Sequence, residues 1–152
     1  MNAKSNTTLL AALAVPFATL FAASIEFPFG ETGLVIGREA TAKLAAEELN
    51  DIVKRSAGQG FAEGDEAKRR IFIGHSAAAE AIIGTNVFNR LLNEESVVFS
   101  KGNDLFLIGG GDLGPLWAVY DFCEDSLGYR WYLDRSDGER IVRTDVVRFN
   151  GT

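Results

Sequence analysis

The sequence predicts a single α/β (α+β) domain: a two-layer sandwich with a mixed sheet of about five to seven strands and two main helices packed on it. Three observations predict this fold. The chain has 152 residues and is 47% hydrophobic, which suffices for one core but not for two ordinary domains. Two segments repeat apolar residues with helical period. Short apolar runs, several of them ending in glycine, alternate with these segments as strands do.

The first 24 residues predict a signal peptide that precedes the domain. Lys4 lies in a short polar leader, and an uncharged apolar run over 9–23 is followed by Ser24. This run is too short for a membrane span, which needs about 20 residues, but it suits a signal-peptide core with small residues at its end. A buried N-terminal helix is the alternative. We expect export to the periplasm or the extracellular space, a domain over 25–152, and no stable membrane span after processing.

The first half of the domain begins with a strand and a long helix. The apolar run 34–36 ends at Gly37 and is the first strand. Residues 39–56 follow with helical period, and Gly58 is a natural C-terminal stop. The polar, glycine-rich stretch 58–68 is then a loop. The apolar stripe of the helix is expected to consist of Ala42, Ala45, Leu49, Ile52 and Val53.

The middle of the chain predicts a second strand, short helices and a hairpin. Residues 70–74 form the strand, and Ser76 caps a short helix through Ile83 by accepting a backbone hydrogen bond. A further helical turn is expected over 87–92. The apolar runs 96–100 and 104–108 are joined by a Lys-Gly-Asn connection, which predicts a tight β-hairpin.

The last third predicts a helix over 115–126 followed by short strands. Proline at the first helical position is favourable because its missing N–H has no partner there anyway. The expected apolar stripe consists of Leu116, Val119, Tyr120, Cys123 and Leu127. Gly128 ends the helix, and the remaining elements are a strand over 129–133, a turn at 136–138 and strands over 140–142 and 146–149.

Charge and composition exclude several classes of function. A net charge of −6 argues against nucleic acid as a partner, because phosphate binding needs a basic face. Cys123 is the sole cysteine and His75 the sole histidine, so neither an intramolecular disulfide nor a zinc-ligand spacing is present. We interpret Cys123 as a small buried hydrophobe and His75 as a structural residue, and we expect no cofactor and no metal.

Three glycines form the sharpest local pattern. Gly109, Gly111 and Gly114 satisfy G-x-G-x-x-G between a strand and a helix, and Asp134 follows about 20 residues later, as in a dinucleotide-binding fold. The pattern lies late in the chain, its strand has a hairpin neighbour, and Asp112 brings a negative charge to the place of a phosphate. A turn that lets strand and helix pack closely is the favoured interpretation, with Rossmann-type nucleotide binding as an alternative.

Acidic residues could serve as acid and base in sugar chemistry, which uses two facing carboxylates. Sequence neighbours on a loop or a solvated helix face do not predict such a pair, and acidic residues around a turn are common for local reasons. None is therefore predicted to be catalytic. The groups considered are Glu94 with Glu95, Glu124 with Asp125, and Asp134 with Asp137 and Glu139.

Arg130, Trp131 and Tyr132 are the candidate contact residues. Aromatic rings beside an arginine can stack on a sugar and hydrogen-bond it. In a strand, Trp131 shares a face with Tyr129, whereas Arg130 and Tyr132 point the other way. We expect one face to be core and the other to meet a sugar or a neighbouring domain.

Four motifs between 103 and 149 carry a family resemblance. They resemble the N-terminal non-catalytic domain of α-glucuronidases, glycoside hydrolase family 67, and of family 20 β-hexosaminidase-like enzymes. Trp117 stands where that family often has tyrosine, and Cys123 where it often has leucine. The motifs are DLFLIGG at 104–110, GPLWAVYDFCE at 114–124, LGYRWY at 127–132 and GERIV at 138–142.

The resemblance implies a domain whose chemistry lies elsewhere. In these enzymes the catalytic carboxylates belong to a (β/α)8 barrel of about 250 residues, which 152 residues cannot contain. No catalytic residue is carried over, the barrel is the expected partner, and the isolated chain is expected to be inactive. The predicted function is that of a non-catalytic accessory domain of a secreted carbohydrate-degrading enzyme. A stand-alone carbohydrate- or partner-binding module is the alternative.

Overall fold

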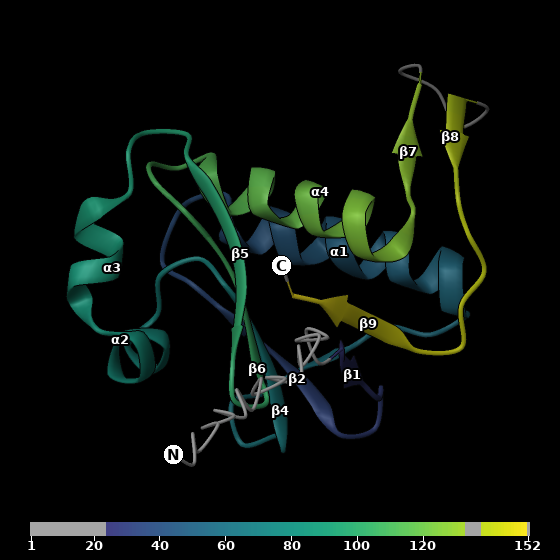
Figure 1. The fold of residues 1–152 in the computed structure, drawn as a ribbon, viewed down its shortest axis with the longest axis horizontal. Coiled ribbons are helices and arrows are strands. Elements are labelled where there is room, and N and C mark those ends of the chain that lie inside the picture. Colours follow the sequence, from purple (N-terminus) through teal and green to yellow (C-terminus); the bar gives the residue numbers. More distant parts are fainter. Residues whose placement is uncertain (1–23, 133–137, 152) are drawn as a thin grey trace, which may run out of the picture.

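The computed structural model describes residues 24–132 and 138–151, which form a mixed α/β fold around one main sheet (Figure 1). The sheet has five strands in the order β3-β2-β4-β6-β5. β3, β2, β4 and β6 run parallel, and β5 is antiparallel to β6. The predicted fold class is therefore confirmed. The strands are β2 (Thr32–Ile36), β3 (Ala62–Glu63), β4 (Arg69–Ile73), β5 (Ser96–Lys101) and β6 (Asp104–Gly109).

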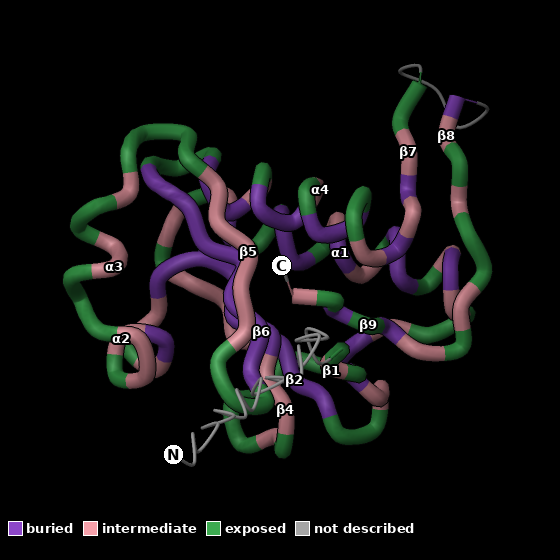
Figure 2. Tube along the Cα trace, viewed as in Figure 1, coloured by how far each residue is buried: buried purple, intermediate pink, exposed green. Residues whose placement is uncertain are grey.

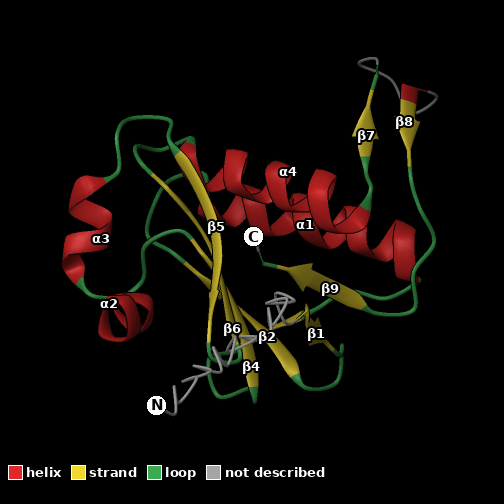
Figure 3. Ribbon diagram, in the orientation of Figure 1, coloured by secondary structure: helices red, strands yellow, loops and turns green. Residues whose placement is uncertain are grey.

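Helices cover both faces of this sheet (Figure 3). The two long helices, α1 (Ala42–Ala57) and α4 (Gly114–Leu127), pack side by side on one face, as predicted for the two main helices. The short helices α2 (Ala77–Ile83) and α3 (Thr85–Arg90) lie on the opposite face. No helix within 24–132 or 138–151 has the length and apolarity needed to cross a bilayer.

The apolar runs of the central strands are buried on both faces, as expected for parallel strands between helices (Figure 2). Ile71 and Ile73 face α1 and α4, and Phe72 faces the short helices. Phe72 stacks on Phe106 of the neighbouring strand with ring centroids 4.8 Å apart. On α1 the whole predicted stripe is buried. On α4 the predicted Leu116 and Tyr120 are only partly buried, and the prediction missed the buried Ala118 and Phe122.

Two further strand pairs complete the structure. β1 (Ser24–Phe27) pairs antiparallel with β9 (Val147–Asn150), which brings the two ends of the described chain together. β7 (Arg130–Trp131) pairs antiparallel with β8 (Glu139–Arg140) and stands out from the body beside α4 (Figure 1).

The sequence missed some of these short strands. Ser24, predicted to end the leader, is the first residue of β1. The predicted loop 58–68 contains β3, a two-residue strand that pairs in parallel with Gly33 and Leu34 of β2. The predicted strand 129–133 is shorter, because β7 covers only Arg130 and Trp131 among the described residues. Most of the predicted turn at 136–138 falls outside the described residues.

Candidate functional site

The first candidate site is the crevice at the carboxyl ends of β2, β4 and β6. The chain leaves β2 and β6 toward α1 and α4 on one face, but leaves β4 toward α2 on the other. In α/β sheets, ligands bind where neighbouring strands are connected to opposite faces. Here Arg38, His75 and the loop Gly109–Asp112 line a hollow of about 250 Å³, together with Glu39, Phe88 and Leu91.

His75 is buried at the centre of this crevice. The guanidinium Nη2 of Arg38 lies 2.7 Å from its Nδ1, and its Nε2 lies 3.2 Å from a carboxylate oxygen of Glu80. This arrangement fits the neutral tautomer that accepts at Nδ1 and carries its proton on Nε2. The imidazole stacks on Phe88 with ring centroids 3.8 Å apart. A hydrogen bond with Thr85, and then the one with His75, lowers the pKa of Glu80 below its usual value. The imidazole thus links three elements of the fold.

The chain's own groups tie the strand ends together. The carboxylate of Glu39 accepts the backbone N–H of His75, with its two oxygens at 2.8 and 2.9 Å. The hydroxyl of Thr41 donates to the backbone carbonyl of Asp112, which joins the start of α1 to the glycine loop. Glu39 and Asp112 both bring negative charge to the crevice, which disfavours a phosphate there.

The glycines of the G-x-G-x-x-G pattern are explained by close packing. A Cβ placed on Gly109 would overlap the backbone of Gly114, and a Cβ on Gly114 would overlap that of Gly109. Gly111 has a φ of 66°, and a side chain there would meet the amide of Asn93. The glycines therefore allow β6 and α4 to touch, as the favoured interpretation of the sequence requires.

β6 has an antiparallel neighbour on one side and a parallel neighbour on the other. The hairpin prediction is right, because β5 and β6 pair antiparallel from Ser96↔Gly109 to Lys101↔Asp104. However, β6 also pairs in parallel with β4 on its other side, so its neighbours are not both antiparallel. Two-sided pairing was invisible in the sequence because β4 lies more than thirty residues upstream of β6. Asp134, the acidic residue of the fingerprint, lies outside the described residues.

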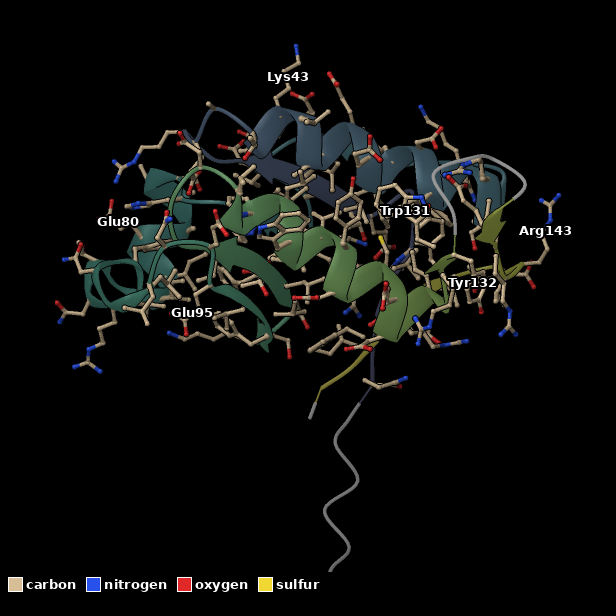
Figure 4. All side chains as sticks on the ribbon, turned by 90° about the horizontal axis from the view of Figure 1, so that it is seen from above. Lys43, Glu80, Glu95, Trp131, Tyr132 and Arg143 are labelled. Atoms are coloured by element: carbon tan, nitrogen blue, oxygen red, sulfur yellow. The ribbon has the colours of Figure 1, made fainter. Side chains whose placement is uncertain are left out.

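The second candidate site is an aromatic face on the outer side of α4 and at the base of β7. The ring of Tyr120 lies 6.1 Å from that of Trp117 and 5.4 Å from that of Trp131, between centroids. Trp117, Trp131 and Tyr132 are 40%, 49% and 65% exposed. Burial of the Tyr120 ring, with the charge of Glu48, raises the pKa of Tyr120 to about 12. Figure 4 labels Trp131 and Tyr132 at the β7 end of the helix layer.

The three predicted contact residues are in different situations. Arg130 donates to the backbone carbonyls of Glu124 at 2.7 Å and of Tyr129 at 2.8 Å, so its guanidinium is held against the end of α4. Trp131 and Tyr132 are exposed. Tyr129 and Trp131, which were expected to share a strand face, differ in exposure: Tyr129 is buried, whereas Trp131 is half exposed and packs against the ring of Tyr120. β7 is too short to impose regular alternation.

Two of the remaining candidate carboxylates are engaged by groups of the chain itself. Glu139 pairs with Arg55, and Glu95 accepts the backbone N–H of Leu92 at 2.7 Å. Asp134 and Asp137 lie outside the described residues. In the described ranges no three His, Cys, Asp or Glu side chains are grouped to hold a metal ion. Burial raises the pKa of the Cys123 thiol to about 12, which is unsuitable for a nucleophile.

No family model, curated protein or solved structure matches this chain. The two surfaces above and the sequence block 103–149 are therefore what supports a functional proposal. Of the two, the crevice is lined by polar groups that already pair with other groups of the chain, whereas the aromatic face has its large side chains open to solvent.

Proposed function

We propose that residues 25–152 form a non-catalytic domain of the N-terminal type found in exported, carbohydrate-degrading glycoside hydrolases of the α-glucuronidase kind. The observation that carries the proposal is the aromatic face that Tyr120 forms with the exposed Trp117 and Trp131, next to the exposed Tyr132. Clustered exposed aromatic side chains mark interaction surfaces, because tryptophan and tyrosine dominate the energetics of interfaces. In the proposed enzyme this face meets the following (β/α)8 barrel.

The arrangement of the described carboxylates supports a non-catalytic role. Glycoside hydrolysis needs two carboxyl groups that flank one bond. Here Glu39 accepts a backbone N–H, Asp104 is paired with Arg70, and Glu139 is paired with Arg55. Each of these three carboxylates is engaged at a separate place in the fold, which supports placing the chemistry in another domain.

An activity assay tests this proposal. The purified chain is incubated with an aryl α-glucuronide and an aryl N-acetyl-β-hexosaminide, and release of the aryl group is followed. The expected result is no release above the blank. The proposal would be refuted if the chain turned over a substrate and a single carboxylate substitution, such as Glu39→Gln or Glu80→Gln, abolished the turnover. Catalysis would then reside in this domain.

A stand-alone carbohydrate-binding or partner-binding module is the second candidate, favoured by the same exposed rings. Affinity electrophoresis in gels with xylan or chitin oligomers separates the two functions. An interface domain migrates as it does in a plain gel. A sugar-binding module would instead be retarded in these gels, and Trp131→Ala would remove the retardation. The matched control Val142→Ala, on another exposed apolar side chain, would leave the retardation intact.

Nucleotide binding remains the third alternative and has its own test. A ligand that binds only the native state raises the melting temperature. The backbone of Gly114 occupies the space next to Gly109, and the backbone of Gly109 occupies the space next to Gly114. NAD or FAD at millimolar concentration is therefore expected to leave the melting temperature unchanged. A concentration-dependent rise would revive the dinucleotide interpretation.

A further inference from the structure

β5 forms one edge of the main sheet, and no described residue pairs with its outer side. Backbone groups in an antiparallel pair point alternately toward and away from the partner strand. The carbonyl of Glu95 accepts the N–H of Gly110 at 2.9 Å, and the two-residue turn places Lys101 opposite Asp104. The odd-numbered residues of β5 therefore face β6. The N–H and C=O groups of Ser96, Val98 and Ser100 point outward.

This edge lacks the features that normally prevent strand pairing. Natural edge strands are blunted by proline, by inward charges, by bulges or by short length. β5 is six residues long, and its stretch 96–100 contains neither a proline nor a charged residue. Lys101 stands only at the end, where its amine donates to the carbonyl of Ile82 at 2.5 Å. The outward backbone groups thus form a regular row with which no described strand pairs.

A groove of about 410 Å³ lies between Val98 of β5, α4 and β9. Side chains of a strand laid along β5 would alternate between this groove and the opposite face of the sheet. The floor of this groove is apolar, and its rim carries two carboxylates. None of its lining residues is basic. The lining residues are Val98, Phe122 and Phe149 with Asp121, Asp125, Ser126 and Asn150.

We propose that the outer edge of β5 is a strand-addition site for an extended segment of a partner protein. Main-chain hydrogen bonds to Ser96, Val98 and Ser100 would supply affinity, and the groove would select the side chains. The apolar floor and the acidic rim of Asp121 and Asp125 fit a segment with an apolar residue flanked by basic residues on one face. A second copy of this chain fits less well, because it would bring its own acidic groove to the same face of the joined sheet. This binding role goes beyond the proposed function and does not depend on the barrel.

Peptide titration tests the proposal. The probe is an acetylated, amidated hexapeptide, Arg-Val-Ile-Val-Arg-Thr, whose first, third and fifth side chains share one face. The control replaces both arginines with glutamate. Added to the ¹⁵N-labelled chain, the basic peptide should give saturable shifts at the amides of Ser96, Val98 and Ser100 and slow their hydrogen exchange, with a Kd below about 1 mM. The acidic peptide should bind at least about fivefold more weakly.

Two variants separate strand addition from nonspecific binding. Val98→Pro removes an outward N–H and keeps the bonds of β5 to β6, so it should weaken the basic peptide at least about tenfold while the amide spectrum stays dispersed. Asp125→Asn removes one exposed charge and should weaken binding about two- to fivefold. If Val98→Pro fails to fold, the Asp125→Asn result and the hydrogen-exchange pattern still decide.

Three results would overturn the proposal. The first is the absence of a saturable shift at millimolar basic peptide. The second is equal binding of the acidic and basic peptides. The third is a dimer in sedimentation analysis without peptide, with the amides of Ser96, Val98 and Ser100 already protected, since a second copy would then occupy the edge.

Discussion

Replacing Gly109 with alanine tests whether β6 and α4 touch at Gly109 and Gly114, as the packing interpretation of the glycine pattern requires. A Cβ at Gly109 would overlap the backbone of Gly114 and lie 2.5 Å from the carbonyl oxygen of Glu95. These are backbone atoms, so no side-chain rotation relieves the overlap, and β6 and α4 must separate. Overpacking costs about 1–3 kcal/mol in general, and we expect about 3 kcal/mol here because both neighbours are rigid. The melting temperature should fall by roughly 10 °C.

Urea unfolding followed by far-ultraviolet circular dichroism measures this loss. Gly30→Ala is the matched control, because no atom lies within 4 Å of a Cβ at that exposed glycine. Its free energy of unfolding should stay within about 0.5 kcal/mol of that of the parent chain. Equal stability of Gly109→Ala and the parent would refute the packing explanation, because β6 and α4 could not then be in contact at Gly109 and Gly114.

Three further changes test other parts of the structure. Asp104→Ala should lower the free energy of unfolding, measured in urea, by about 2–3 kcal/mol, because it leaves the guanidinium of Arg70 without its partner. The Nη2 of Arg70 donates to this buried carboxylate at 2.6 Å. An unchanged unfolding midpoint would contradict the buried pair. Cys123 should resist a disulfide reagent until the chain unfolds. Because the pKa of this thiol is raised in the folded chain, the thiol of the unfolded chain ionises at lower pH. The contribution of Cys123 to the free energy of unfolding should therefore be fully present below pH 9 and fall by up to about 1.4 kcal/mol per pH unit as the pH rises toward 12. Cys123→Ala should reduce this slope. Trp131→Ala should change the free energy of unfolding by less than about 1 kcal/mol, because the ring is half exposed; a larger loss would show that Trp131 belongs to the core.

Features set by local chemistry could be predicted from the sequence. The apolar stripe of α1 follows from helical period, and Gly58 ends that helix in the left-handed conformation with a φ of 79°. Ser76 caps α2 by accepting the N–H of Ala79 at 3.1 Å. The Lys-Gly-Asn connection forms the predicted hairpin turn, and Gly102 has a φ of 63°. In each case neighbouring residues alone decide the conformation.

Features that depend on distant partners could not be predicted. β3 has two residues and exists only because it lies beside β2, and β1 is defined by its pairing with β9 at the other end of the chain. The Arg38–His75 contact joins loops after two different strands, so no local pattern signals it. The exposure of Trp131 was missed for the same reason, since Tyr120 of α4 rather than strand alternation decides how that ring packs.

The same distinction applies to the candidate sites. Trp131 and Tyr132 could be singled out because aromatic residues beside an arginine are recognisable in the sequence, whereas the anchoring of Arg130 by the end of α4 was not. The acidic groove beside β5 draws on α4 and β9 together, so it becomes visible only when the chain is folded.

The central claim is that the chemistry of this protein belongs to a barrel outside residues 25–152. Sequencing the gene and its transcript downstream of codon 152 tests this claim most directly. The claim predicts an open reading frame that continues into about 250 residues of alternating strand and helix patterns. A stop codon directly after Thr152 in both gene and transcript would contradict it.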